Sequence, residues 1–376
     1  MALPHTSTSP GTHKLLGLEL LRFIATISVL LWHYPHFAYV ADAPVGLVRS
    51  ELPFYRVLFP FYELGEYGVL IFWCISGFIF FWKYSAIIPD GTVDGWTFFV
   101  NRLSRLYPLH LATLLLVAGL QALYVAQHGF FFVYQSNDLA HFVAQLFMAS
   151  DWLPPTGVSF NGPIWSVSIE VLVYAVFFLA LRFVTTSPLL NLAMILAGIV
   201  SGTLVGKCLV FFYAGGLAAM ARQGVANAWY RPKLEALAAC AVVGIPMALW
   251  LSGVELAERA AALLLITTPI LLFVCATPLT LPRRIEDLLQ AAGNMTYSCY
   301  LLHFPVQLAI ALVFASLGRA IPYGSHLFWL GFMGLSLTAA YLTYGWFEAP
   351  TQRLIRRVLL RKEKAGRIAP APLPHH

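Results

Sequence analysis

The sequence predicts an all-α integral membrane protein in which about ten transmembrane helices form one bundle, with both termini in the cytoplasm. Hydrophobic residues make up 59% of the 376 positions and charged residues only 11%, and the mean hydropathy is +0.75. A water-soluble domain contains about 25% charged residues. Apolar runs long enough to cross a bilayer recur along nearly the whole chain. These observations exclude a soluble globular fold.

The order of polar and apolar segments divides the chain into three parts. We expect a polar cytoplasmic tail at 1–14, a membrane domain at 15–350 and a basic cytoplasmic tail at 351–376. Within the connection 128–160, the apolar piece 141–148 is too short to cross and is expected to be interfacial or re-entrant. The predicted spans are 15–38, 65–87, 107–127, 163–184, 187–206, 208–222, 234–252, 259–278, 292–316 and 326–347.

The distribution of basic residues predicts the topology of these spans. Of the 23 Lys and Arg residues, seventeen fall on the side that holds both termini, five fall on the other side, and Arg22 lies within a span. Lys and Arg concentrate in cytoplasmic segments of membrane proteins. The net charge of +6 therefore reflects topology, and no nucleic-acid partner is expected. The five cysteines have no metal-type spacing, and no metal site is expected.

The first span contains the ionisable residues Glu19, Arg22 and His33. Arg22 and His33 are eleven residues apart, which places them on one helix face about 16 Å apart along the axis. An ionisable residue within a span is costly and is a candidate for a functional site. The alternative is structural: Arg22 pairs with Glu19 near the interface, and His33 belongs to an interfacial aromatic belt.

Two further clusters of polar residues interrupt the apolar pattern. Arg102 and Arg105 share a helix face at the start of the third span, where they serve either as phosphate ligands or as cytoplasmic anchors. Glu170 lies inside the fourth span, after Trp165 and Ser166, and needs a partner or a proton there.

The last two candidates lie near the end of the chain. His303 in the ninth span is either functional or a satisfied core histidine. Glu348 ends the tenth span, where the simpler interpretation is an ion pair with an arginine of the basic tail.

Together these stretches resemble the bacterial integral-membrane acyltransferases known as acyltransferase family three. The resemblance covers residues 15–356, although Glu19 stands where many members have Asp. It rests on six stretches in the same order: ELLRFIATISVLLWH, GVLIFWCISGF, FFVNRLSRLYP, IWSVSIEVLVY, TYSCYLLHFPV and FEAPTQRL.

The resemblance implies a multi-pass enzyme of the bacterial cytoplasmic (inner) membrane, working alongside a polysaccharide assembly or export machinery. It would move an acetyl or other short acyl group from acyl-CoA, with acetyl-CoA as the expected donor, to a hydroxyl of a carbohydrate or glycolipid. His33 would be the general base or a covalent acyl carrier. Glu170 would orient His33 or hold the acceptor. Coenzyme A phosphates would bind Arg22, Arg102 and Arg105, and the secondary candidates are Trp165, Ser166, His303 and Glu348.

Two functions of other classes also fit a chain of this composition. A proton-coupled transporter of a sugar-like or anionic substrate would use buried Glu, Arg and His as a relay, but paired Gly- or Pro-broken spans in two halves are not found. An inactive assembly partner is the other alternative, and the presence of His33 weighs against it.

Overall fold

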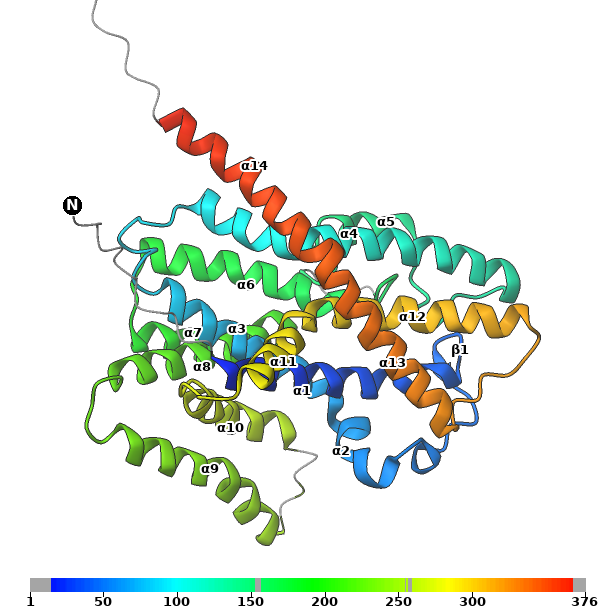
Figure 1. Ribbon diagram of the computed structural model, residues 1–376, viewed down its shortest axis with the longest axis horizontal. Coiled ribbons are helices and arrows are strands. Elements are labelled where there is room, and N and C mark those ends of the chain that lie inside the picture. The colour runs from blue at the N-terminus through cyan, green and yellow to red at the C-terminus, as the bar shows by residue number, and fades with distance from the viewer. Residues whose placement is uncertain (1–14, 153–156, 254, 256–258, 368–376) are drawn as a thin grey trace, which may run out of the picture.

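The computed structural model describes residues 15–152, 157–253, 255 and 259–367 of the chain. The predicted tail 1–14 and the last part of the tail 351–376 lie outside these residues. Most long helices run side by side along the long axis of the molecule in one bundle (Figure 1). The α-helices are α1 (Leu16–His33), α2 (Tyr55–Leu64), α3 (Gly68–Tyr84), α4 (Gly95–His128), α5 (Leu139–Leu146), α6 (Ile164–Phe183), α7 (Pro188–Ser201), α8 (Leu204–Gly224), α9 (Arg231–Leu251), α10 (Ala260–Cys275), α11 (Arg283–Asn294), α12 (Thr296–Ser316), α13 (His326–Thr343) and α14 (Ala349–Arg367).

Short elements connect the first helices and the last ones. After α1 the chain forms the 3-10 helix η1 (Tyr34–Ala38), and β1 (Tyr39–Val40) then pairs antiparallel with β2 (Ala43–Pro44). The 3-10 helices η2 (Arg49–Glu51) and η3 (Gly65–Tyr67) flank α2, and the π-helical turn η4 (Tyr344–Glu348) joins α13 to α14.

The helices confirm an all-α chain with apolar segments of membrane-spanning length. Within the described residues, 8 helical stretches are long and apolar enough to cross a bilayer. The predicted spans at 187–206 and 259–278 form the shorter apolar helices α7, with 14 residues, and α10, with 16. About 20 residues are needed to cross the hydrocarbon core. The count of ten spans and the cytoplasmic position of both termini remain predictions.

Helix α4 is much longer than the predicted third span, 107–127. It begins at Gly95 because the side chain of Asp94 accepts a hydrogen bond from the Thr97 backbone N–H at 2.8 Å, which caps the helix. It ends at Gly129, whose φ of 77° suits a glycine at a helix C-terminus. Arg102 and Arg105 therefore lie inside one continuous helix.

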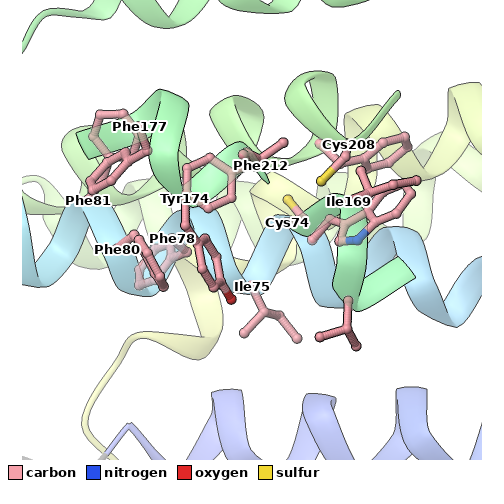
Figure 2. Packing of buried hydrophobic residues seen from close by; sticks show 14 of the residues in the cluster. Cys74, Ile75, Phe78, Phe80, Phe81, Ile169, Tyr174, Phe177, Cys208 and Phe212 are labelled. Carbon is pink, nitrogen blue, oxygen red and sulfur yellow. The ribbon is translucent and has the colours of Figure 1, made fainter. Parts of the chain in front are cut away.

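The main hydrophobic core lies between α3, α6 and α8, where aromatic rings interlock (Figure 2). Helices α3 and α8 approach until their backbones touch. A Cβ atom at Gly77 would collide with the Phe212 carbonyl, and one at Gly215 would collide with the Cys74 carbonyl. Glycine at both positions allows this packing, which gives α3 and α6 a fixed support at one side of the site described below.

The C-terminal helix α14 packs against α4 and crosses the front of the bundle obliquely (Figure 1). The sequence indicated only a basic tail for this segment. Its first part is instead an ordered helix that continues from η4.

Candidate active site

A cavity lies between α1, α3, α4, α6 and α12 and contains about 830 Å³ of empty space counted out to its mouth. Its walls are mainly aromatic and aliphatic, with a few charged and hydroxyl side chains, a composition typical of a site for a small organic ligand. The lining residues are Arg22, Val69, Phe72, Trp73, Ser76, Ile79, Phe80, Arg102, Arg105, Leu106, Ser166, Val167, Glu170, Tyr174, Thr296, Tyr297 and Tyr300.

The cavity brings together several of the residues that the sequence singled out, although they are far apart along the chain. Three helices supply them, so no local pattern could have shown that they share one space. They are Arg22 on α1, Arg102 and Arg105 on α4, and Ser166 and Glu170 on α6.

Arg22 is held from two sides at the wall of the cavity. Its Nη1 lies 3.1 Å from Glu19 Oε2, and its Nη2 donates to Thr296 Oγ1 at 3.1 Å. The pairing with Glu19 that was considered as a structural alternative is thus present. Because the guanidinium also lines the cavity, structural pairing and ligand contact are compatible at this residue.

Arg102 and Arg105 present hydrogen-bond donors that the protein leaves unused. Arg102 Nη2 donates to Tyr84 Oη at 3.2 Å and its guanidinium lies over the Phe80 ring, yet its Nε is buried without a partner. Arg105 lines the cavity and makes no hydrogen bond with a described residue, while the carboxylates of Glu170 and Glu348 lie within its electrostatic range. A buried unpaired donor costs about 1–3 kcal/mol. An anionic ligand with several acceptor oxygens would satisfy both side chains.

Glu170 lies in the cavity, where Tyr174 Oη donates to its Oε1 at 2.6 Å. The suggestion that Glu170 orients His33 is wrong. His33 hydrogen-bonds instead through Nδ1 to the Val29 carbonyl of its own helix, at 2.8 Å. Glu170 can therefore contact a ligand in the cavity but does not set the orientation of the histidine.

Ser166 belongs to a hydrogen-bond network between α6 and α12. Tyr300 Oη donates to the Pro163 carbonyl at 2.9 Å, so the 2.7 Å contact between Ser166 Oγ and Tyr300 Oη has the serine as donor. Trp165 does not line the cavity; it packs edge-to-face on Trp73, which does. Its role is support for the wall.

His33 lies outside the cavity, in a buried group of three histidines. Its ring centroid is 4.8 Å from that of His303 on α12 and 5.0 Å from that of His36 on η1. Since the Val29 carbonyl can only accept, His33 Nδ1 carries the proton and Nε2 keeps a free lone pair, the form that a general base requires. Gln307 Nε2 donates to the His33 carbonyl at 2.9 Å and ties α1 to α12.

Helix α12 links the cavity to the histidines. Tyr300 lines the cavity, and its ring centroid is 6.1 Å from that of His303, which in turn contacts His33. Helix α1 is unbroken from Leu16 to His33. The expected separation of Arg22 and His33, about 16 Å along the axis, therefore holds, and the two cannot act on the same atom.

Glu348 is buried at the end of η4 and accepts a hydrogen bond from Ser298 Oγ at 2.5 Å. Among the described residues it makes no ion pair, so the interpretation as a partner of an arginine in the basic tail is wrong. The residue fastens the start of α14 to α12.

His36 and Tyr300 are the main residues that the sequence interpretation missed. His36 follows His33 by three positions and Tyr300 precedes His303 by three, so both lay beside residues already noted. His36 Nδ1 and both ring nitrogens of His303 are buried without a hydrogen-bond partner in the described part of the chain. Across those same residues, no three His, Cys, Asp or Glu side chains are arranged to hold a metal ion.

Comparisons with known proteins identify the family of the chain. Residues 15–345 match the family model described as an acyltransferase domain, family three. Acyltransferase MdmB of Streptomyces mycarofaciens is 30% identical over 197 residues, which are 52% of this chain and 46% of that relative, so the chain matches about half the relative's length. No solved structure matches the chain significantly. Because the family model covers most of the sequence, this protein belongs to acyltransferase family three.

Proposed function

We propose that the protein is an acyl-CoA-dependent O-acyltransferase that transfers an acetyl or other short acyl group to a hydroxyl of a saccharide or glycoconjugate. The observation that carries the proposal is the placement of arginines at one part of the cavity and of a histidine beyond another part of its wall. Guanidiniums with unused donors line it on α4, and the wall at Tyr300 on α12 leads to a histidine with a free Nε2.

The arginines suit the head of the donor. Coenzyme A carries several phosphate charges that cannot enter hydrocarbon, and planar guanidiniums bind phosphate oxygens in pairs. Arg102 and Arg105 are the main ligands in this proposal, with Arg22 beside them. The mainly apolar remainder of the cavity suits the pantetheine arm. Glu170 is assigned to the arm's amide N–H groups, since a carboxylate accepts hydrogen bonds.

The reaction is assigned to the histidine end. His33 Nε2 removes the proton of the acceptor hydroxyl as its oxygen attacks the thioester carbon. The tetrahedral intermediate then collapses, the carbon–sulfur bond breaks, and the coenzyme A thiolate takes the proton from the His33 imidazolium. His303 packs on His33 and holds the ring in place. In the covalent variant, His33 Nε2 attacks the thioester first and the carbon–sulfur bond breaks to release the coenzyme A thiolate. The acceptor hydroxyl then takes the acyl group from His33, and its proton goes to the thiolate.

The setting of the reaction follows from the same proposal. A saccharide or glycolipid acceptor requires access from the histidine side of the bundle. We place the enzyme in the bacterial inner membrane, alongside the machinery that assembles or exports polysaccharide.

The test uses purified protein in nanodiscs with radiolabelled acetyl-CoA, and it measures donor binding and thioester loss separately. We expect His33→Ala to bind the donor normally and lose turnover, and Arg102→Ala to lose binding. His128→Ala is the matched control, because His128 lies at the far end of α4, stacked on Tyr124. If the wild type shows no saturable binding of acetyl-CoA or longer acyl-CoAs, the proposal fails and a proton-coupled transporter becomes the better interpretation.

A further inference from the structure

Arg356 on α14 is anchored to the segment of α4 that carries the two unpaired arginines. Its Nε donates to Ser104 Oγ at 3.2 Å, and its Nη2 donates to the Asn101 carbonyl at 3.0 Å. These contacts join positions more than 250 residues apart in the sequence. Arg356 also lies beyond residues 15–345, the part that matches the family model.

The anchoring places a third guanidinium beside Arg102 and Arg105. Asn101 and Ser104 directly precede these residues in α4, and Arg356 lies within electrostatic range of both. None of the three arginines makes an ion pair with a carboxylate in the described part of the chain.

The three like charges repel one another, and the repulsion is strong where the surroundings are partly buried. The carboxylates of Glu170 and Glu348 lie within electrostatic range of Arg105 and offset part of it, but neither forms an ion pair with the three arginines. Arg356 uses Nε and Nη2 for the protein and makes no hydrogen bond through Nη1. Arg102 has its unpartnered Nε, and Arg105 makes no hydrogen bond with a described residue. The cluster keeps charge and donors together for an anion that would relieve the repulsion and fill the donors.

We propose that Arg356 is a third phosphate-binding residue of this site and that α14 completes the site for the nucleotide phosphates of the donor. The proposal rests on the acyl-CoA donor proposed above. Arg356 does not line the cavity around the acyl arm, so its ligand is the phosphorylated head and not the pantetheine. The exposed Arg357 next to it makes no hydrogen bond in the described structure and takes no part.

A phospholipid head group offers the same phosphate chemistry. It is an alternative ligand because α14 leaves the bundle beside α4, where a lipid could reach Arg356. Two observations favour the nucleotide. The two neighbouring arginines line the cavity between the helices. The Arg356 guanidinium is turned toward α4, where it bonds Ser104 and Asn101, whereas a lipid ligand would be met by the exposed face of α14.

The experiment measures equilibrium binding to the full-length protein in nanodiscs of neutral phosphatidylcholine. The variants are Arg356→Gln, which keeps a donor amide but removes the charge, and Arg357→Gln as the control with the same charge change. The probes are coenzyme A and pantetheine, which lacks phosphate. The thermal midpoint of each ligand-free variant reports whether α14 is still packed.

We expect Arg356→Gln to weaken coenzyme A binding at least tenfold with pantetheine binding unchanged, and Arg357→Gln to change coenzyme A binding less than twofold. The ligand-free thermal midpoint of Arg356→Gln should fall, because its two hydrogen bonds to α4 are lost, so binding is measured well below the midpoint of every variant. Three results would overturn the inference. In the first, Arg356→Gln binds coenzyme A as tightly as the wild type while Arg102→Ala loses binding; the proposal of an acyl-CoA donor would then survive and the role of Arg356 would not. The second is an equal loss of pantetheine binding, which indicates a structural role. The third is competition by phosphatidylglycerol in the wild type that Arg356→Gln abolishes, which assigns the arginine to lipid. Absence of any coenzyme A binding by the wild type would instead refute the donor itself.

Discussion

Replacement of Tyr300 by Phe tests whether the hydroxyl of this cavity residue beside His303 acts in catalysis or only holds the wall. Phenylalanine keeps the ring and its packing on His303, so only the hydroxyl is lost. In the structure that hydroxyl already donates to the Pro163 carbonyl at 2.9 Å and accepts from Ser166 Oγ at 2.7 Å. Its proton is therefore not available to an oxyanion at the thioester.

The expected loss of stability follows from these two hydrogen bonds. A buried hydrogen bond contributes about 0.5–1.5 kcal/mol, so losing both lowers the free energy of unfolding by about 1–3 kcal/mol. Ser166 Oγ lies 3.4 Å from the Pro163 carbonyl and recovers part of this. Because the proton is already committed, we expect kcat to fall less than about tenfold, whereas loss of an oxyanion donor costs about 100–1,000-fold.

The assay pairs steady-state acetyl-CoA turnover with thermal unfolding in the same nanodiscs. Tyr341→Phe is the control, since Tyr341 is 58% exposed and makes no hydrogen bond with a described residue. Its stability should change by less than about 0.5 kcal/mol. A fall in kcat above about 100-fold with unchanged stability would refute the reasoning, because the hydroxyl would then have to leave Pro163 and donate to the transition state.

Two further substitutions test the supports of the cavity. Thr296→Val removes the acceptor of the Arg22 Nη2 hydrogen bond. Because hydrogen bonds to charged groups are the stronger class, the free energy of unfolding should fall by about 1.5–3 kcal/mol in thermal unfolding. Thr296→Ser, which keeps the hydroxyl, should recover most of this loss. Gly215→Ala forces a Cβ against the Cys74 carbonyl and should destabilise the protein by about 1–3 kcal/mol. Gly119→Ala is the control, because no atom lies near its Cβ, and it should be neutral or stabilising. Equal thermal midpoints for the two variants would contradict the close packing of α3 on α8.

The sequence was sufficient to predict the long apolar helices because hydropathy acts locally, but not α2 and most of α11, which lie in segments predicted as connections. Every predicted span corresponds to a helix of the structure. Helix α4 exceeded its prediction because its first turns are polar on one face, and the capping of Asp94, not hydropathy, determines where it begins. The docking of α14 could not be predicted, since its basic pattern also fits a solvated tail and the anchoring atoms are a serine hydroxyl and a backbone carbonyl of α4.

The sequence predicted several residues of the site but not how they are arranged in space. Ionisable residues in apolar helices led to Arg22, Arg102, Arg105 and Glu170, and these share one cavity. Periodicity places residues around one helix and says nothing about the rotation of a neighbouring helix. For that reason the contact of His33 with His303 became clear only when α1 lay beside α12, and the separate hydrogen-bond partners of Glu170 and His33 became clear only from the structure.

The separation of arginines and histidines restricts how the proposed transfer can proceed. Arg22 and His33 lie on one unbroken helix, about 16 Å apart, so a single bound donor must span the distance from phosphate to thioester. The pantetheine arm is the only part of coenzyme A that is long and slender enough to do so. The acyl group then reaches the histidines only when the phosphates are fully seated at α4. Donor binding and chemistry are therefore separable by mutation at opposite ends of α1, and a short donor such as acetylpantetheine should react at His33 weakly but without dependence on Arg102.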